Sequence, residues 1–151
     1  ELSLKLMAKV LIKKLDPAVK LPAYKTSGAS GMDLMAFIKE PIIIKSKTSS
    51  LIPTGISVAF SENYEIQIRP RSGLAAKKNI TVLNTPGTID SDYRGEIKII
   101  LYNHGSDDFN INNGDRIAQM ILTPIIKMEL EETNELPETI RGEGGFGSTG
   151  K

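Results

Sequence analysis

The sequence predicts an all-β domain with one short helix, and three features support this fold class. Eight prolines are scattered through the 151 residues, and few of the segments between them could hold a long helix, because proline disrupts helix interiors. The same segments contain short runs rich in β-branched residues, several of which alternate apolar with polar side chains as half-buried strands do. Turn residues recur between the runs, a pattern typical of a β-sandwich or barrel.

The clearest elements can be placed in chain order. The helix candidate is residues 72–78, for which Pro70 prepares a turn and Ser72 is the expected N-cap. The run at 80–83 leads into Pro-Gly and Arg-Gly turn signals and the run at 96–101 leads out, which predicts a hairpin with Asp90 and Tyr93 on its rim. Strands are expected at residues 41–44, 56–60, 66–68, 80–83 and 97–101, and segments 30–36 and 114–121 each combine a turn with a strand.

The composition indicates one domain, residues 1–151, and excludes several kinds of chemistry. With 40% hydrophobic residues the chain can bury one sizeable core, and neither a repeat nor a linker divides it. A net charge of +1 gives no electrostatic reason to expect a nucleic-acid polymer or a membrane as partner. Cysteine is absent, which excludes disulfides and thiolate metal sites and favours a cytoplasmic location. Met7 could be the native start, with residues 1–6 as a leader, and His104 is interpreted as a surface turn residue.

The chain ends in a glycine-rich stretch, RGEGGFGSTG at residues 141–150, which has two interpretations. Glycine-rich termini are commonly loose, and Phe146 would then have no role. Alternatively, the tail orders over a ligand, with Phe146 stacked on a planar base. Backbone N–H groups freed by glycine, the hydroxyls of Ser148 and Thr149, and the guanidinium of Arg141 would then hold phosphate oxygens. The stretch is not a Walker A loop, because the Lys-[Ser/Thr] ending is missing.

Two internal stretches could contact a nucleotide, although each has a simpler interpretation. RPRSGLA, residues 69–75, places an arginine and a hydroxyl at a helix N-terminus, which suits an anion but also fits a plain capped turn. NTPGTIDSDYRG, residues 84–95, could present backbone N–H and C=O groups in a fixed array that reads a base edge, or could be a solvated acidic turn.

Two further polar residues are ambiguous in the same way. Asp33, in the stretch SGMDLMA, could face a metal ion or merely cap a turn. Gln119, in the stretch GDRIAQMI, is polar among apolar neighbours and would also fit an edge strand.

The joint order of five stretches is more specific than any one of them. SGMDLMA, RSGLA, GTIDSDYRG, GDRIAQMI and RGEGGFGSTG follow one another between Ser30 and Gly150 and resemble the ordered motifs of the homotrimeric dUTP pyrophosphatase (dUTPase) family. The resemblance implies a jelly-roll-like trimer with active sites shared between subunits. It implies hydrolysis of dUTP to dUMP and pyrophosphate, which keeps uracil out of DNA and supplies dUMP for thymidylate synthesis. Residues 139–151 would be a flexible lid exchanged between subunits, ordering only over bound ligand.

The resemblance also implies a role for each matching residue. Asp90 would be the general base that activates water, with Arg71 and Gln119 close to the phosphates. The remaining substrate contacts are Asn84, Gly87, Thr88 and Ile89 on uracil; Tyr93 on the deoxyribose; Lys98, through its backbone; Arg71, Ser72 and Gly73 on the phosphates; Phe146 stacked on uracil; and Arg141, Gly147, Ser148 and Thr149 on the terminal phosphate.

The implied cofactor is Mg²⁺, carried mainly by the triphosphate and by water. This ion commonly keeps waters and binds through phosphates with few protein ligands, so Asp33 would act only through a coordinated water.

Two rival functions remain at this point. A dCTP deaminase, or a bifunctional relative, would share the fold but needs a carboxylate and a water at the base; the order DSDYRG and the full GGFGSTG tail favour the pyrophosphatase. A non-catalytic jelly-roll protein would have no reason to keep Asp90, Tyr93, Arg71 and Phe146 together.

Overall fold

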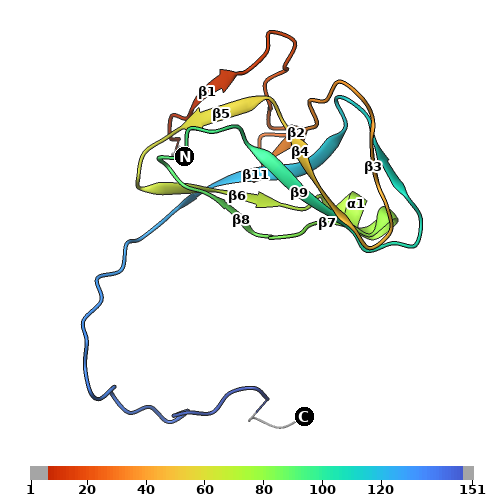
Figure 1. Cartoon of the computed structure of the whole chain (residues 1–151). Coiled ribbons are helices and arrows are strands. Elements are labelled where there is room, and N and C mark those ends of the chain that lie inside the picture. Colours follow the sequence, from red (N-terminus) through yellow and green to blue (C-terminus); the bar gives the residue numbers. More distant parts are fainter. Residues whose placement is uncertain (1–6, 148–151) are drawn as a thin grey trace.

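The computed structural model describes residues 7–147, which form eleven strands and one helix (Figure 1). The strands are β1 (Leu11–Lys14), β2 (Met32–Met35), β3 (Ile42–Ile44), β4 (Ser49–Pro53), β5 (Ile56–Ala59), β6 (Tyr64–Arg69), β7 (Ile80–Val82), β8 (Gly87–Ile89), β9 (Lys98–Asn103), β10 (Phe109–Ile111) and β11 (Arg116–Pro124), and the helix is α1 (Ser72–Lys78). In this part of the chain no helix has the length and hydropathy needed to cross a membrane.

Two antiparallel sheets contain most of the strands. The first has the order β2-β11-β6-β8, and the second has the order β4-β9-β7. The remaining strands form two pairs, β1 with β5 and β10 with β3. Because β11 and β6 are the two inner strands of the first sheet, β2 and β8 form its edges, and both edges carry residues of the predicted site.

The hydrophobic core lies between these sheets, because one face of each is apolar. Leu34, Ile66 and Ile68 are buried from the first sheet, and Ile99 and Leu101 are buried from the second. Complete burial of such a side chain contributes about 1.5–3 kcal/mol. The intervening residues of β6 are only partly buried, as the two-residue period of a half-buried strand requires. The outward face of the first sheet is therefore free to carry polar chemistry.

The structure confirms the predicted helix but corrects its cap. The N-cap position belongs to Arg71, whose backbone is extended (φ −87°, ψ 129°) and whose carbonyl oxygen accepts the N–H of Ala75 at 3.1 Å. Ser72 is already the first helical residue, so its hydroxyl is displaced from the position where a cap receives the free N–H groups of the first turn. Among the described residues, no side chain makes a cap hydrogen bond to the N-terminus of α1.

The predicted hairpin is also present, with one addition. Its two arms pair as β7 and β9, with Val82 opposite Leu101. The segment between the arms is not a simple loop, because its residues 87–89 form β8 and join the other sheet beside β6. Each of the other predicted strand segments also contains a strand. The rim of the hairpin is thus held by both sheets.

The chain leaves the folded body after β11 (Figure 1). The N–H of Ile125 still donates to the carbonyl oxygen of Asn63 at 2.9 Å. From residue 126 to residue 147, the recorded hydrogen bonds stay within this segment. Its large apolar side chains are open to solvent; they are Ile126, Met128, Leu130, Leu136, Ile140 and Phe146.

Candidate active site

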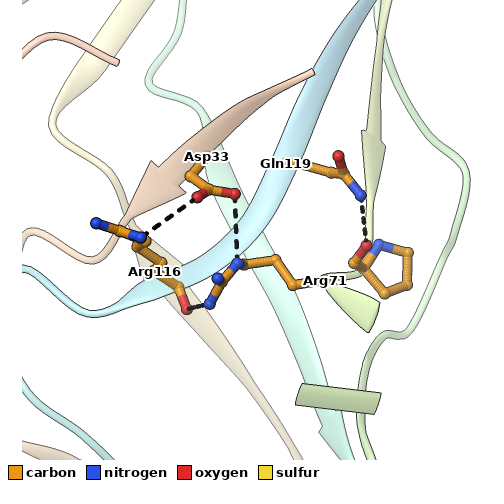
Figure 2. Close-up of polar contacts among 5 residues, drawn as sticks. Asp33, Arg71, Arg116 and Gln119 are labelled. Carbon is orange, nitrogen blue, oxygen red and sulfur yellow. Dashed lines mark hydrogen bonds and ion pairs between the residues drawn. The ribbon is translucent and has the colours of Figure 1, made fainter. Parts of the chain in front are cut away.

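A carboxylate and two arginines meet on the outward face of β2 and β11 (Figure 2). Asp33 lies inside β2 and does not cap a turn. Its Oδ1 is 3.3 Å from Nε of Arg71, and its Oδ2 is 3.9 Å from Nη1 of Arg116. Such partly exposed pairs contribute only about 0–1 kcal/mol to stability. Their main effect is to hold both guanidinium groups beside β11. With Gln119, these three residues form what we call the arginine cluster.

A β-bulge in β11 turns Arg116 to the same face as Gln119. In a regular strand, residues three apart would point to opposite faces, because successive side chains alternate. The register of β11 against β2 shifts between Arg116 and Ala118, and both Ile117 and Ala118 are buried. A bulge of this kind inserts one residue and reorients the side chains around it. It therefore allows Arg116 and Arg71 to reach Asp33 together.

Gln119 lies on an inner strand, which corrects the edge-strand interpretation. β11 runs between β2 and β6, with Gln119 opposite Asp33 on one side and Arg69 on the other. Its Nε2 donates to the carbonyl oxygen of Pro70 at 3.0 Å, which joins β11 to the turn before α1 (Figure 2). A Cβ at Gly31 would come within 2.9 Å of Gln119 Oε1 and 3.0 Å of the carbonyl oxygen of Met120, so a larger residue there would crowd this amide.

The other two residues of the predicted phosphate contact begin α1. Ser72 and Gly73 are both exposed. No heavy atom would lie within 4 Å of a Cβ at Gly73, so the backbone there is open to a ligand. Since α1 has only seven residues, we attribute any anion binding here chiefly to the arginines rather than to the helix.

A cleft of about 330 Å³ opens beside β8, the edge strand of the first sheet. We call it the β8 cleft. Its lining comes from β4, from β8 and the turn after it, and from the start of β9; the residues are Leu51, Thr88, Ile89, Asp90, Tyr93, Glu96 and Lys98. A second cavity of about 260 Å³, between the segment around Val19 and β2, has no acidic side chain in its lining and offers no general base.

Asp90 and Tyr93 are joined by a tight turn at the mouth of this cleft. The N–H of Tyr93 donates to the carbonyl oxygen of Asp90 at 3.1 Å. The Asp90 side chain is exposed, and among residues 7–147 its carboxylate has no recorded hydrogen bond or ion pair. A carboxylate in this state can accept a proton from a water molecule. The ring of Tyr93 is 43% exposed, and its hydroxyl donates to the carbonyl oxygen of Glu96 at 2.8 Å.

The residues expected to read a base lie along β8 and the segment before it. Gly87 is buried against Ile68, where a Cβ would come within 3.2 Å of Ile68 Cβ and 3.3 Å of Asn84 Nδ2. On one side, β8 pairs with β6. Its other side is a sheet edge, where N–H and C=O groups have no strand partner and can pair with a ligand. Thr88 and Ile89 lie on this edge and line the cleft.

Within one chain, the arginine cluster and the β8 cleft lie apart. β2 and β8 are the two edges of a four-stranded sheet, so they are separated by roughly 14 Å at the usual strand spacing. The two parts are also displaced along the strands. Gln119 is opposite Arg69 on β6, whereas Ile89 is opposite Ile66 on the same strand, and these three residues of β6 add an offset of roughly 10 Å. One chain therefore presents two separate parts of the predicted site.

The predicted tail residues form a third part. Phe146 is fully exposed and has a positive φ of 52°. Arg141 Nε donates to the carbonyl oxygen of Gly144 at 2.7 Å, which makes a small turn within the tail. Ser148 and Thr149 lie outside the described residues.

Comparison with known proteins identifies the family. The family model named dUTPase matches residues 18–150. The chain belongs to the dUTPase family. A relative from Rickettsia bellii (strain OSU 85-389), named deoxyuridine 5'-triphosphate nucleotidohydrolase, is 57% identical over 145 residues, which cover 95% of this chain and 97% of that protein.

Solved dUTPases have the same fold. A dUTPase of Staphylococcus bacteriophage 80alpha, with dUpNHpp, matches with a TM-score of 0.85 at 23% identity over 95% of this chain and 99% of that one. A mutant dUTPase from phage phi11 of S. aureus, described with a structural Mg(II) ion, has a TM-score of 0.78 at 20% identity over 86% of this chain and 99% of that one. The predicted all-β, jelly-roll-like fold class is thus confirmed.

The donors of this dUTPase fit a magnesium ion carried mainly by the nucleotide. Among residues 7–147, no group of three or more His, Asp or Glu side chains is placed to hold a metal. Asp33 is a single carboxylate beside two guanidinium groups, which suits contact through a coordinated water better than direct ligation. When bound, the ion would neutralise phosphate charge.

Three residues of these two groups were not identified from the sequence. Arg116 lies in a stretch that the resemblance matched, but its side-chain direction depends on a bulge that alternation does not predict. Leu51 comes from β4, a strand that no sequence pattern indicated. Glu96 was placed only as part of the outgoing hairpin arm, and nothing in its neighbours indicates the contact with Gly55 that the structure shows.

Proposed function

We propose that this dUTPase hydrolyses dUTP by attack of water on the α-phosphorus, with Asp90 as the general base. The observation that carries the proposal is the exposed Asp90 carboxylate at the mouth of the β8 cleft, which no group of residues 7–147 engages and which lies one turn from the Tyr93 ring. The water gives a proton to this carboxylate as its oxygen bonds to phosphorus, and pyrophosphate leaves with the electrons of the broken P–O bond. The product dUMP supplies thymidylate synthesis, and removal of dUTP keeps uracil out of DNA.

The β8 cleft would hold the nucleoside. The free edge of β8 at Gly87, Thr88 and Ile89 offers backbone donors and acceptors to the uracil edge, with Asn84 beside Gly87. Uracil and cytosine differ in their donor and acceptor pattern at this edge, and a narrow slot would exclude the 5-methyl group of thymine. Tyr93 would pack against the deoxyribose and leave no room for a ribose 2′-hydroxyl. Lys98 would contribute through its backbone.

The arginine cluster would hold the phosphates. Arg71 keeps its remaining N–H donors for phosphate oxygens, since Asp33 and the carbonyl oxygen of Arg116 take only its Nε and one Nη1 contact. Gln119 is held close by through Pro70. Ser72 and Gly73 add an exposed hydroxyl and an open backbone. Asp33 would contact the magnesium ion of the nucleotide through water.

These two parts would act together only between subunits of a trimer. A general base works within about 3 Å of the water that it activates. In one chain, the β8 cleft and the arginine cluster are several times farther apart than that, so one phosphate cannot contact both. The site would therefore combine the β8 cleft of one subunit with the arginine cluster of its neighbour.

The tail would complete the site from another subunit. Residues 126–131 alternate apolar and charged side chains, with Ile126, Met128 and Leu130 exposed by 96%, 82% and 86%. This pattern is typical of a strand with one buried face, yet within residues 7–147 the segment pairs with no other strand. Docking it on a neighbouring subunit would bring residues 139–151 over that subunit's site. Phe146 would stack on uracil, and Arg141, Gly147, Ser148 and Thr149 would hold the terminal phosphate. The cytoplasmic location predicted from the sequence completes this proposal.

The decisive assay is release of pyrophosphate from dUTP, compared with UTP and dTTP. We expect release from dUTP in the presence of Mg²⁺ and much slower release from the other two. Incubation with dCTP, with ammonia as the readout, tests the deaminase alternative. Ammonia release from dCTP without pyrophosphate release from dUTP would overturn the proposed function.

A further inference from the structure

The Tyr93 ring folds back on its own chain, where it is held by Gly95 and Glu96. A Cβ at Gly95 would lie 2.5 Å from Cζ of Tyr93, so no larger residue fits under the ring. The Tyr93 hydroxyl donates to the carbonyl oxygen of Glu96 at 2.8 Å. One side of the ring therefore rests on backbone, while Tyr93 as a whole stays 43% exposed.

The side chain of Glu96 in turn joins this turn to the body of the protein. Its Oε2 accepts a hydrogen bond from the N–H of Gly55 at 2.9 Å, across 41 positions of sequence. Gly55 is buried and has a φ of +73°, and a Cβ there would lie 2.6 Å from Val19 Cγ2 and 3.0 Å from Phe37 Cδ1. Gly55 is thus packed closely against Val19 and Phe37, and a hydrogen bond to its N–H joins Glu96 to the core.

Backbone contacts continue the same junction beyond Glu96. The N–H of Ile97 donates to the carbonyl oxygen of Ile56 at 2.9 Å. The Thr54 hydroxyl donates to the carbonyl oxygen of Ile97 at 2.5 Å. Residues on the Tyr93 side of Glu96 have no such contact with segment 54–56 among the hydrogen bonds recorded for residues 7–147. On the C-terminal side of the turn that carries Tyr93, Glu96 is therefore the last attachment to segment 54–56, whereas the N-terminal side of the turn is held by the pairing of β8 with β6.

A carboxylate in this cleft is electrostatically unfavourable for substrate binding, because the cleft would receive an anionic nucleotide. Glu96 lines the β8 cleft together with Asp90, and a second negative charge there repels phosphate. A charge-assisted hydrogen bond to a fixed N–H group is, however, roughly twice as strong as a neutral one. The structure shows the carboxylate turned to Gly55.

We propose that Glu96 is a positioning residue for sugar selection, acting through Tyr93. Its bond to Gly55, together with the backbone bond from the N–H of Ile97 to Ile56, holds the carbonyl oxygen that receives the Tyr93 hydroxyl, and so holds the ring that would exclude a ribose. The proposal rests on the proposed function, in which Tyr93 packs against deoxyribose. Without the Glu96 carboxylate only the backbone bond from Ile97 holds this peptide group, so the ring is less firmly placed and a 2′-hydroxyl is excluded less strictly.

The test compares kcat/KM for dUTP and for UTP in matched variants. Glu96→Ala removes the carboxylate that accepts the Gly55 N–H but keeps the backbone carbonyl that accepts the Tyr93 hydroxyl. We expect the dUTP/UTP ratio to fall by about tenfold, the effect of one lost hydrogen bond to a charged group. We expect the KM for UTP to fall. The kcat for dUTP should change much less, because Asp90 is unchanged. Glu96→Gln keeps an acceptor oxygen and is expected to retain most of the ratio.

Asp92→Ala is the matched control for charge. Asp92 is exposed in the same turn and has no recorded contact with Gly55 or Tyr93, so its removal deletes one negative charge without changing the ring. We expect it to leave the ratio unchanged. A fall in the ratio for Asp92→Ala equal to that for Glu96→Ala would show a charge effect and overturn the proposal.

If Glu96→Ala does not fold, Tyr93→Phe is measured in its place. This variant keeps the ring but removes the donor to Glu96, so the ratio should fall by a similar factor. A wild-type ratio in either folded variant overturns the positioning role. The proposed function fails separately, if the wild-type protein releases no pyrophosphate from dUTP.

Discussion

Asp90 illustrates how position, rather than residue type, selects a general base in this chain. The sequence contains 18 acidic residues, and most of them lie on exposed turns or in the tail. Asp90 differs because it directly follows the edge strand β8, lines a cleft and, in the part of the chain that the structure describes, has a carboxylate without a hydrogen-bond or ion-pair partner. Asp33 has the opposite environment, since two arginines engage it. The two carboxylates are therefore suited to different roles, one to accept a proton and the other to orient cations.

The first prediction concerns this base. Asp90→Asn should leave binding of an imido analogue such as dUpNHpp nearly unchanged, because shape and most polar contacts persist. It should lower kcat for dUTP by about 10²–10⁴-fold, the usual contribution of a general base. Asp92→Asn, in the same turn, serves as control. Steady-state kinetics and calorimetric titration measure both quantities, and an unchanged kcat would refute the assignment of Asp90.

Among the elements, the turn between β4 and β5 depends most clearly on glycine. Gly55 combines a left-handed backbone with contacts that leave no space for a Cβ. It also donates to Glu96 and accepts the N–H of Leu15 at 2.8 Å. A change at this turn is therefore transmitted to the β8 cleft as well as to the core.

The second prediction follows from this geometry. Gly55→Ala should lower the free energy of unfolding by about 2–4 kcal/mol, from the strain of a left-handed backbone and the crowding of Val19. Urea denaturation measures the change. Gly28→Ala is the control, since a Cβ there would meet no atom within 4 Å. Equal midpoints for the two variants would show that the turn relaxes without cost.

The tail is the second element with a clear experimental consequence. Deletion of residues 141–151 should leave the assembled body intact and reduce kcat/KM for dUTP at least as much as Phe146→Ala does. For Phe146→Ala we expect a fall of about 5- to 150-fold, the value of one base–aromatic stack. Phe146→Tyr keeps a ring and should keep most of the activity. If truncation dissociates the protein in size-exclusion chromatography, the tail is structural and the lid role is wrong.

At the scale of the whole molecule, the separation of the β8 cleft from the arginine cluster predicts complementation. Asp90→Asn and Arg71→Ala should each be nearly inactive alone. After denaturation and refolding together in equal amounts, about one site in four would combine an intact Asp90 from one subunit with an intact Arg71 from another. Pyrophosphate release should therefore recover to about that fraction of the wild-type rate. Refolding each variant separately is the control, and no recovery after mixing would place the whole site within one chain.

The sequence predicted the parts that depend on local pattern. Alternation identified the segments of β6 and β9, proline and helix formers placed α1, and motif order indicated the family. It did not predict features that depend on how distant strands meet. The direction of Arg116 requires the bulge in β11, the inner position of Gln119 requires the order of the sheet, and the contact between Glu96 and Gly55 spans 41 residues. The prediction that Ser72 is the N-cap was wrong. Ser72 is already the first residue of the helix, and the N-cap position belongs to Arg71.

The bulge in β11 also limits how this strand can vary. Replacing Arg116 by lysine would keep a cation near Asp33 but lose the planar fork of donors, whereas pairing the same residues without the bulge would turn the side chain of Arg116 inward and that of Ile117 outward. The straightened strand would form a more regular sheet while losing one of the two cations beside Asp33. Natural or laboratory descendants of this chain should therefore keep two consecutive buried residues at positions 117 and 118, where a regular strand would alternate.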